Sequence, residues 1–183
     1  MRQGFKEQQV VADEAAVDAA LGRLADELVE SADNLDRLAL VGIHTRGVPL
    51  SQRLQARIEA RAGVRVPLGM IDISLYRDDA LEGLPSPVVG ETRLDFPIEG
   101  FRIVLVDDVL YTGRTIRAAL DAIVDFGRPQ SIQLLVLADR GHRELPIEPQ
   151  YVGHRVETER NDSVKVILEE VSGKPTQIIH YIA

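Results

Sequence analysis

The stretch from residue 103 to residue 115, IVLVDDVLYTGRT, constrains the fold more than any other part of the chain. It begins as an apolar, β-branched run, which is typical of a buried strand in a parallel sheet. Asp107 and Asp108 follow where this strand is expected to leave the sheet. A short turn then leads into an apolar pattern of helical period that starts at Ile116 and ends at Val124. The stretch therefore predicts a strand, an acidic pair, a turn and a helix in direct succession.

Each part of this stretch has a chemical use. The start of a helix offers unpaired N–H groups and the positive end of the helix dipole, which suits a phosphate monoester. Gly113 allows a positive φ and close backbone approach, and Thr112 and Thr115 add hydroxyl donors. Adjacent carboxylates bind phosphate poorly, but they accept hydrogen bonds from a vicinal diol such as the 2- and 3-hydroxyls of ribose. The combination predicts a site for a ribose 5-phosphate.

Two other interpretations of the acidic pair exist. A magnesium site of a P-loop NTPase is excluded, because the sequence contains no G-x-x-x-x-G-K-[ST] motif. The pair is also compatible with a solvated strand end that precedes an ordinary capped helix. For two adjacent aspartates alone that plain interpretation is preferable, but the ordered combination of strand, acids, turn and helix favours the ribose 5-phosphate site.

Composition limits the class of protein. The 183 residues are 45% hydrophobic, which suits one globular domain with an ample core. The chain has no cysteine, so disulfides and thiolate metal sites are excluded. A net charge of −8 argues against indiscriminate nucleic-acid binding and leaves a local basic face open. No segment has the apolar length of a signal peptide core or a membrane span, so we expect a cytoplasmic protein without a membrane partner.

A second strand, turn and helix precede the central stretch. Residues 13–31 carry one helical apolar stripe, and residues 38–43 form a buried strand. This strand runs into the sequence His-Thr-Arg-Gly at 44–47, and the helix that follows is expected to stop at Gly63. An ordinary turn explains residues 44–47 equally well in isolation. Because they repeat the central arrangement, they indicate a second anion site, with Thr45 and Arg46 facing pyrophosphate.

The rest of the chain contributes a long connection and further strands. A strand is expected at residues 66–73. The region of about 74–100 is rich in Gly and Pro, and sequence alone does not separate a mobile lid from a surface loop. Residues 132–138 form the next buried strand. Short strands at 151–152, 164–168 and 177–182 are expected to form an antiparallel appendage within the C-terminal region 150–183.

Alternating strands and helices predict an α/β fold, with a parallel sheet flanked by helices on both faces and a small appendage of short strands. Ligands of such sheets bind beyond the carboxyl ends of the strands. The loops at 45–47, 107–115 and 139–143 all lie there and all carry polar groups. Their convergence is stronger evidence for a site than any one motif.

The run VLVDDVLYTGRT, residues 104–115, resembles the phosphoribosyl pyrophosphate (PRPP) signature of type I phosphoribosyltransferases. The blocks VGIHTRG at 41–47, IDISLYRDD at 71–79 and DRGHRELP at 139–146, with Gly-Arg-Pro at 127–129, are similar to the PyrR family. That family comprises bifunctional pyrimidine operon regulators with uracil phosphoribosyltransferase activity. The resemblance covers about residues 38–162 and implies one phosphoribosyltransferase-like domain over residues 1–183.

Membership would imply that uracil and PRPP give UMP and pyrophosphate, with Mg²⁺ bound together with PRPP. The residues implied as catalytic are Asp107, Asp108 and Arg46, and the two aspartates would meet the metal mainly through PRPP or water. The substrate-binding residues implied by matching position are Thr45, Arg46, Gly47, Tyr76, Arg77, Asp107, Asp108, Val109, Leu110, Tyr111, Thr112, Gly113, Arg114, Thr115, Asp139 and Arg140. Tyr76 and Arg77 would belong to the closing loop, and the loop at 139–140 would border uracil. No residue stands out as a general base.

The resemblance also implies binding of pyrimidine-operon leader RNA when UMP is bound, on a basic surface of a homo-oligomer that is at least a dimer. His142 and Arg143 match that surface, and Arg155 and Arg160 are further candidates. The acidic residues Glu148, Glu157 and Glu159 depart from a basic surface. A uracil salvage enzyme without RNA binding therefore stays open as the alternative, as does a transferase for another base such as a purine.

Overall fold

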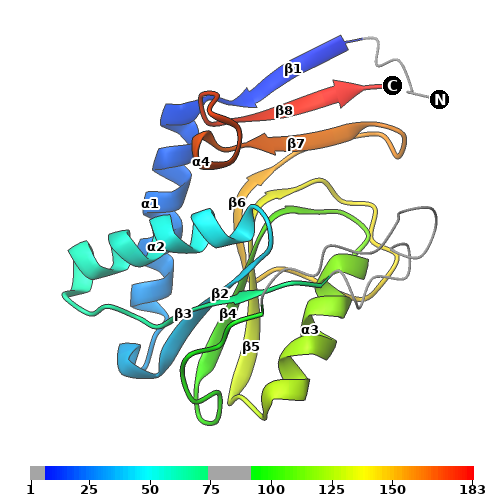
Figure 1. Cartoon of the computed structure of the whole chain (residues 1–183). Coiled ribbons are helices and arrows are strands. Elements are labelled where there is room, and N and C mark those ends of the chain that lie inside the picture. Colours follow the sequence, from blue (N-terminus) through cyan, green and yellow to red (C-terminus); the bar gives the residue numbers. More distant parts are fainter. Residues whose placement is uncertain (1–6, 74–91) are drawn as a thin grey trace.

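Within the residues that the computed structural model describes, 7–73 and 92–183, the chain forms a five-stranded sheet and a three-stranded sheet (Figure 1). The five-stranded sheet, called here the large sheet, has the order β3-β2-β4-β5-β6, and each neighbouring pair is parallel. Its strands are β2 (Leu38–Ile43), β3 (Leu68–Ile71), β4 (Arg102–Leu110), β5 (Ser131–Asp139) and β6 (Tyr151–Arg155). The predicted α/β fold class is confirmed.

Alternate residues of the central strands face two separate apolar clusters, as expected for a sheet that is covered on both sides. On one face lie Leu38, Leu40, Val104, Val106, Leu135 and Leu137. On the other lie Ala39, Val41, Ile103, Leu105, Leu134 and Val136. Burial on both faces explains why these strands read as continuous apolar runs.

The helices cover the two faces unequally (Figure 1). Helices α1 (Glu14–Glu30) and α2 (Gly47–Ala62) pack on the first face, and α3 (Arg114–Phe126) packs on the second. The predicted helix ends are confirmed at Asp13, whose side chain caps α1, and at Gly63, which has a φ of 69°. The last residue of the predicted apolar pattern in α3 does not face the core. Val124 lies on the outer side of α3 and is 62% exposed.

The three-stranded sheet, called here the small sheet, is antiparallel and lies beyond the N-terminal start of α1 (Figure 1). It has the order β1-β8-β7, formed by β1 (Glu7–Ala12), β7 (Ser163–Ile167) and β8 (Gln177–Ile182). The short helix α4 (Glu169–Ser172) connects β7 to β8, and a short 3₁₀ turn (Leu35–Arg37) precedes β2. None of the helices in the described ranges is both long and apolar enough to cross a membrane.

Two predictions about the appendage need correction. Tyr151 and Val152 do not join the small sheet; they open β6, which extends the large sheet by pairing in parallel with Leu135 and Val136. Strand β1 was not predicted, because its sequence EQQVVA is mostly polar and exposed. It forms through pairing with β8, a long-range contact that local sequence patterns do not report.

The predicted strand at 66–73 is shortened to the four residues of β3. Residues 74–91 of the predicted lid lie outside the described residues. The last part, 92–100, is packed on the domain: Ile98 is 3% exposed, and Leu94 and Phe96 contact the same apolar cluster as α3. In this segment, Arg93 forms one isolated antiparallel bridge with Met70.

Candidate functional site

Strands β2, β4 and β5 are adjacent and parallel, so their carboxyl ends lie at one edge of the large sheet. This edge carries the three loops that the sequence singled out. They are the β2–α2 turn (residues 44–46), the β4–α3 turn (residues 111–113) and the loop that follows β5 from residue 140 onward. The predicted convergence of these loops is confirmed.

Two glycines hold the β2–α2 turn against β4. A Cβ atom on Gly47 would lie 2.2 Å from the carbonyl oxygen of Val106, and one on Gly42 would lie 2.6 Å from the carbonyl oxygen of Gly47. Neither position has room for a side chain. The peptide bond between His44 and Thr45 is cis. Backbone packing therefore places Thr45 and Arg46 at the start of α2, next to the end of β4.

The acidic pair lies inside β4 and not beyond its end as predicted, because the strand continues to Leu110 and Asp107 is paired with Val136 of β5. Asp107 is 6% exposed, and its carboxylate accepts the backbone N–H of Asp108 at 2.8 Å. The carboxylate Oδ2 of Asp108 lies 3.6 Å from a guanidinium nitrogen of Arg46. The structure thus brings together the three residues predicted to be catalytic.

Burial sets the electrostatics of this pair. It raises the pKa of Asp107 well above the ordinary aspartate value, and the neighbouring charge of Asp108 raises it further. Burial also raises the pKa of Asp108, while the guanidinium of Arg46 opposes that shift. Two carboxylates held close together in a buried strand are costly to ionise, and a cationic ligand beside them would offset that cost.

The β4–α3 turn ends at Gly113, whose φ of 91° confirms the predicted positive φ. Gly113 is the N-cap of α3 and has no side chain to cap it, and the hydroxyl of Thr112 accepts the backbone N–H of Arg114 at 3.4 Å. The carbonyl oxygen of Thr112 accepts the backbone N–H groups of Glu144 at 2.9 Å and Leu145 at 3.2 Å. Arg114 turns its Nε toward the carboxylate of Glu144, at 2.8 Å. The turn offers an anion the backbone of the helix start, and residues 143–147, called here the supporting loop, hold it in place.

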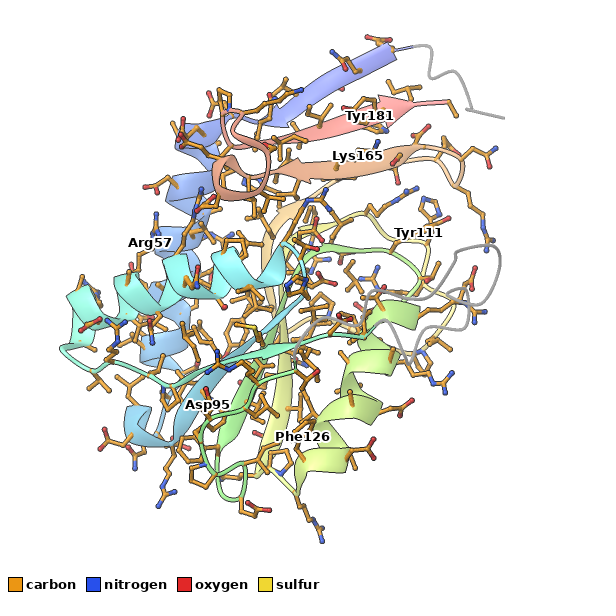
Figure 2. All side chains as sticks on the ribbon, viewed as in Figure 1. Arg57, Asp95, Tyr111, Phe126, Lys165 and Tyr181 are labelled. Atoms are coloured by element: carbon orange, nitrogen blue, oxygen red, sulfur yellow. The ribbon has the colours of Figure 1, made fainter. Side chains whose placement is uncertain are left out.

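The remaining residues of the predicted stretch take three positions. Val109 pairs with Ala138 inside the large sheet, and Leu110 is 1% exposed. Thr115 lies in the first turn of α3. Tyr111 lies between the start of α3 and the small sheet (Figure 2), and its hydroxyl donates to the carbonyl oxygen of Arg160 at 3.2 Å. Predicted residues Tyr76 and Arg77 lie outside the described residues.

Asp139 and Arg140, expected to border the base, are both nearly buried, at 5% and 6% exposed. The guanidinium of Arg140 donates to the carbonyl oxygens of Asp162 at 2.8 Å and Glu159 at 3.0 Å, and it lies 4.1 Å from the ring centre of Tyr111. Arg140 therefore ties the end of β5 to the loop between β6 and β7. These contacts of Arg140 stabilise the packing of the two segments.

The four residues predicted to bind RNA differ in how far their side chains are exposed. Arg155 and Arg160 have side chains that are 72% and 68% exposed. The side chain of Arg143 is 14% exposed, and the ring nitrogen Nε2 of His142 lies 2.7 Å from the carbonyl oxygen of Thr158. Arg160 also lies 3.2 Å from Glu144, which compensates part of its charge.

Sequence reasoning missed the residues that join these loops to the small sheet. Glu144 accepts hydrogen bonds from both Arg114 and Arg160. Asp162 accepts from His180 of β8 at 2.8 Å and from the backbone N–H groups of Glu159 and Ala183, which lower its pKa to about 2. Glu144 lies within the DRGHRELP block, but both of its partners are distant in sequence, as are His180 and Ala183, two of the partners of Asp162, so no local signal marks these contacts.

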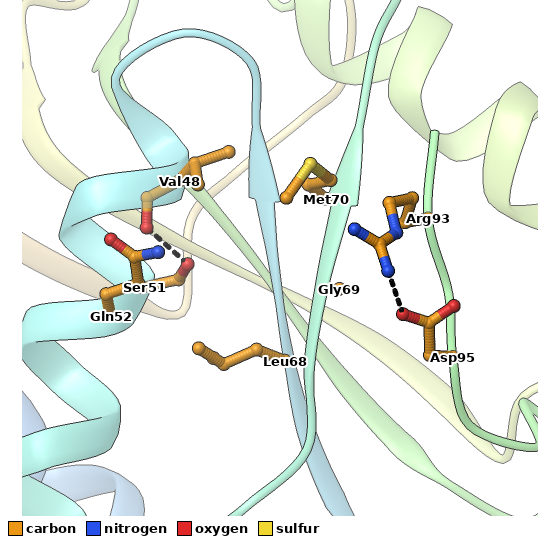
Figure 3. Close-up of a pocket in the computed structure, with 8 residues that line it drawn as sticks. All are labelled: Val48, Ser51, Gln52, Leu68, Gly69, Met70, Arg93 and Asp95. Atoms are coloured by element: carbon orange, nitrogen blue, oxygen red, sulfur yellow. Dashed lines mark hydrogen bonds and ion pairs between the residues drawn. The ribbon is translucent and has the colours of Figure 1, made fainter. Parts of the chain in front are cut away.

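The molecule has a hollow away from this sheet edge. It lies between α2 and β3 and is lined by Val48, Ser51, Gln52, Leu68, Gly69, Met70, Arg93 and Asp95 (Figure 3). The charged groups in it, Arg93 and Asp95, pair with each other at 3.1 Å, and Ser51 donates to the carbonyl oxygen of Val48. The polar groups converge on one another, so the sheet edge remains the candidate site.

Comparison with known proteins agrees with the resemblance to phosphoribosyltransferases. The chain matches the model of the phosphoribosyl transferase domain over residues 8–170. It is 53% identical over 154 residues to the bifunctional protein PyrR of Deinococcus radiodurans, covering 84% of each chain. It is 57% identical over 155 residues to the bifunctional protein PyrR of Thermus aquaticus, covering 85% of this chain and 86% of that one.

Solved structures support the fold. A hypoxanthine phosphoribosyltransferase from Staphylococcus aureus superposes with a TM-score of 0.70 at 21% identity, covering 98% of this chain and 93% of that one. The hypoxanthine phosphoribosyl transferase of Trypanosoma cruzi gives 0.72 at 18% identity, covering 99% and 94%. At these identities the structural similarity supports the fold alone. The extent and identity of the sequence matches decide the family: this chain is a phosphoribosyltransferase-domain protein of the PyrR family.

Proposed function

We propose that this protein transfers the ribose 5-phosphate of PRPP to uracil and, with UMP bound, regulates pyrimidine biosynthesis by binding operon leader RNA. The observation that supports the proposal is that the β2–α2 and β4–α3 turns lie at the same sheet edge as the acidic pair of β4, in a chain of the PyrR family. PRPP is a ribose with an anion at each end. The site has an anion-binding turn on each side of a pair of diol acceptors.

The substrate is positioned by its charged ends. The β4–α3 turn receives the 5-phosphate at the start of α3, where backbone N–H groups and the helix dipole favour an anion. The β2–α2 turn receives the pyrophosphate, with Thr45 and Arg46 as donors. Asp107 and Asp108, which lie between the two turns, accept the ribose hydroxyls. Fixing both ends of PRPP leaves C1 of the ribose as the point that uracil attacks.

In the reaction, the bond from C1 to the pyrophosphate oxygen breaks, a bond from C1 to N1 of uracil forms, and the proton on that nitrogen is released. Positive charge develops on the ribose as the leaving group departs, and the carboxylates of Asp107 and Asp108 stabilise it electrostatically. Arg46, 3.6 Å from Asp108, stays near enough to stabilise the departing pyrophosphate. Catalysis therefore rests on positioning and charge, and no side chain is assigned as a general base.

Phosphoribosyltransferase domains use PRPP as its magnesium complex, and the donor set here fits that group. Carboxylate oxygens suit Mg²⁺, and the buried pair gains from a cation because its ionisation is otherwise opposed. No set of three His, Cys, Asp or Glu residues able to hold a metal occurs within 7–73 and 92–183. When bound, Mg²⁺ would supply Lewis-acid neutralisation of the leaving pyrophosphate. Asp107 and Asp108 would hold it, mainly through PRPP or water.

The regulatory half of the proposal rests on the loops beside the site. Arg155 and Arg160 are exposed cations within reach of RNA phosphates, and His142 lies in the same loop region. Acidic groups reduce this basic character. Glu144 pairs with Arg160, and Glu148 is 75% exposed nearby. This specific observation keeps a salvage transferase without RNA binding as the second candidate.

Two measurements test the proposal. In the first, the protein and Mg²⁺ are supplied with PRPP and uracil, hypoxanthine or guanine, and UMP formation from uracil is expected. Product from a purine but not from uracil would overturn the assignment of the base. The protein is also expected to sediment as a homo-oligomer, at least a dimer.

In the second measurement, the host's pyrimidine-operon leader RNA is titrated near physiological salt with and without UMP. Binding that strengthens with UMP supports the regulator. Absence of RNA binding, with uracil and PRPP still converted to UMP, would leave the salvage enzyme.

A further inference from the structure

Each of the three guanidinium nitrogens of Arg143 donates a hydrogen bond within the protein. Its Nη2 donates to the carboxylate of Asp139 at 2.8 Å, its Nη1 to the carbonyl oxygen of Tyr111 at 3.1 Å, and its Nε to the carbonyl oxygen of Ile147 at 3.0 Å. These partners lie at the end of β5, in the β4–α3 turn and at the end of the supporting loop. One side chain therefore joins three segments that meet at the candidate site.

The supporting loop contacts the β4–α3 turn by other means as well. The backbone N–H groups of Glu144 and Leu145 donate to the carbonyl oxygen of Thr112. A Cβ atom on Gly113 would lie 3.3 Å from the Ile147 side chain and 3.5 Å from that of Leu145, so these side chains cover the glycine. The position of the turn consequently depends on the position of the supporting loop, which Arg143 anchors at both ends.

The side chain of Arg143 is more buried than those of Arg155 and Arg160. Its side chain is 14% exposed, against 72% for Arg155 and 68% for Arg160. Its acidic partner Asp139 is 5% exposed. An arginine whose nitrogens all bond to groups inside the fold is poorly placed to neutralise an RNA phosphate, whereas a nearly buried, hydrogen-bonded ion pair suits the positioning of a loop.

We propose that Arg143 is a positioning residue of the transferase site: it fixes the β4–α3 turn in the geometry that receives the 5-phosphate, and it is not a contact for RNA. The inference rests on the proposed function, since it takes the turn to be the phosphate site. Arg143 acts through the backbone of Tyr111 and through the supporting loop. Its loss leaves Asp139 nearly buried with Arg155 as the remaining cation, at 3.3 Å.

The experiment compares Arg143→Ala and Arg143→Lys with the wild-type protein, using UMP and uridine as probes of binding. The two probes differ by the 5-phosphate. Loss of the three hydrogen bonds is expected to weaken UMP binding about tenfold or more, while uridine binding changes less than about twofold. In the transferase reaction, the KM for PRPP rises and the KM for uracil does not. Lysine keeps the positive charge but has one terminal nitrogen in place of the three guanidinium nitrogens. Arg143→Lys is therefore expected to stay impaired in UMP binding.

Arg128→Ala is the matched control, because Arg128 is an exposed arginine just beyond the other end of α3 and its removal changes the net charge equally. It should leave UMP and uridine binding unchanged. The inference would be overturned in favour of an RNA contact by a different result. In that case Arg143→Ala would bind UMP as the wild type does but lose RNA binding at saturating UMP, and Arg143→Lys would recover RNA binding. Equal losses for UMP and uridine would also overturn it, because the effect would then not be specific to the phosphate. A wild-type protein that binds no UMP would contradict the proposed function itself.

Discussion

The two turns that receive the anions of PRPP in our proposal are held in place by different means. The β2–α2 turn is held by backbone packing, with Gly47 against Val106 and Gly42 against Gly47. The β4–α3 turn is held from outside by side-chain and backbone hydrogen bonds from residues 143–147. The first turn is therefore built into the sheet, and the second depends on a loop that comes later in the chain. A defect in the first should disturb folding and binding together, and a defect in the second should disturb binding with little effect on folding.

The largest effect is expected at Gly47. A Cβ atom there would lie 2.2 Å from the carbonyl oxygen of Val106, so Gly47→Ala must push the start of α2 away from β4. We expect a loss of about 3 kcal/mol in the free energy of unfolding, measured in urea, and a raised KM for PRPP. The control is Gly22→Ala in α1, where no atom lies within 4 Å of the added Cβ; it should stabilise the protein by about 1 kcal/mol. Similar unfolding curves for the two variants would show that the first turn tolerates displacement.

Asp108 lies between the two turns, so its removal tests the chemistry that they share. Asp108→Asn is expected to lower kcat/KM for PRPP about 100-fold, because a carboxylate that accepts the ribose hydroxyls and stabilises positive charge is lost. Its thermal unfolding should not fall below that of the wild type. Asp121→Asn, at an exposed position of α3, is the control and should retain activity. An unchanged kcat/KM in Asp108→Asn would contradict the ribose assignment.

A smaller effect, on stability, is expected at Asp107. Its pKa is raised in the folded protein, so between the ordinary aspartate value of 3.8 and the raised value the folded state binds more protons than the unfolded state. The free energy of unfolding must then fall as the pH rises through that window. Asp107→Asn should remove this fall and be more stable than the wild type at neutral pH while losing activity. An equal loss of stability at acid and neutral pH would instead show that the carboxylate is needed for packing.

The smallest effect is expected at Glu144, which connects the second turn to the RNA-binding candidates. Its carboxylate is hydrogen-bonded by Arg114 and Arg160, and these bonds lower its pKa, so it remains charged. Glu144→Gln removes a negative charge beside Arg160 and is expected to tighten leader-RNA binding about twofold, with a steeper salt dependence. Glu30→Gln, at the exposed end of α1, is the control. Weaker RNA binding in Glu144→Gln would mean that the carboxylate orders the RNA surface and does not oppose it.

The same contrast explains how much the sequence could predict. The strands of the large sheet, the glycine at position 113 and the turn at residues 44–47 are visible in short stretches, because burial on both faces and positive φ leave local patterns. The convergence of the loops followed from the rule that parallel strands end at one edge of a sheet.

The parts that stayed hidden depend on distant partners. Strand β1 is mostly polar and exists because it pairs with β8. The support that Glu144 and Leu145 give to Thr112 joins residues more than thirty positions apart. Arg143 could be matched to an RNA surface by resemblance, but burial against Asp139 is a property of the tertiary structure. Residue type indicates what a side chain can bind, and only packing decides which face it presents.

The strand order of the small sheet has a consequence for synthesis. Because β8 lies between β1 and β7, neither of those strands has its partner until residues 177–182 have been made. The large sheet, by contrast, draws on residues 38–155 alone. A nascent chain can therefore assemble the large sheet while β1, which precedes that sheet in the chain, still lacks β8. During that interval the exposed edge of β1 is open to pairing with other chains, which makes completion of β8 the step that closes the fold.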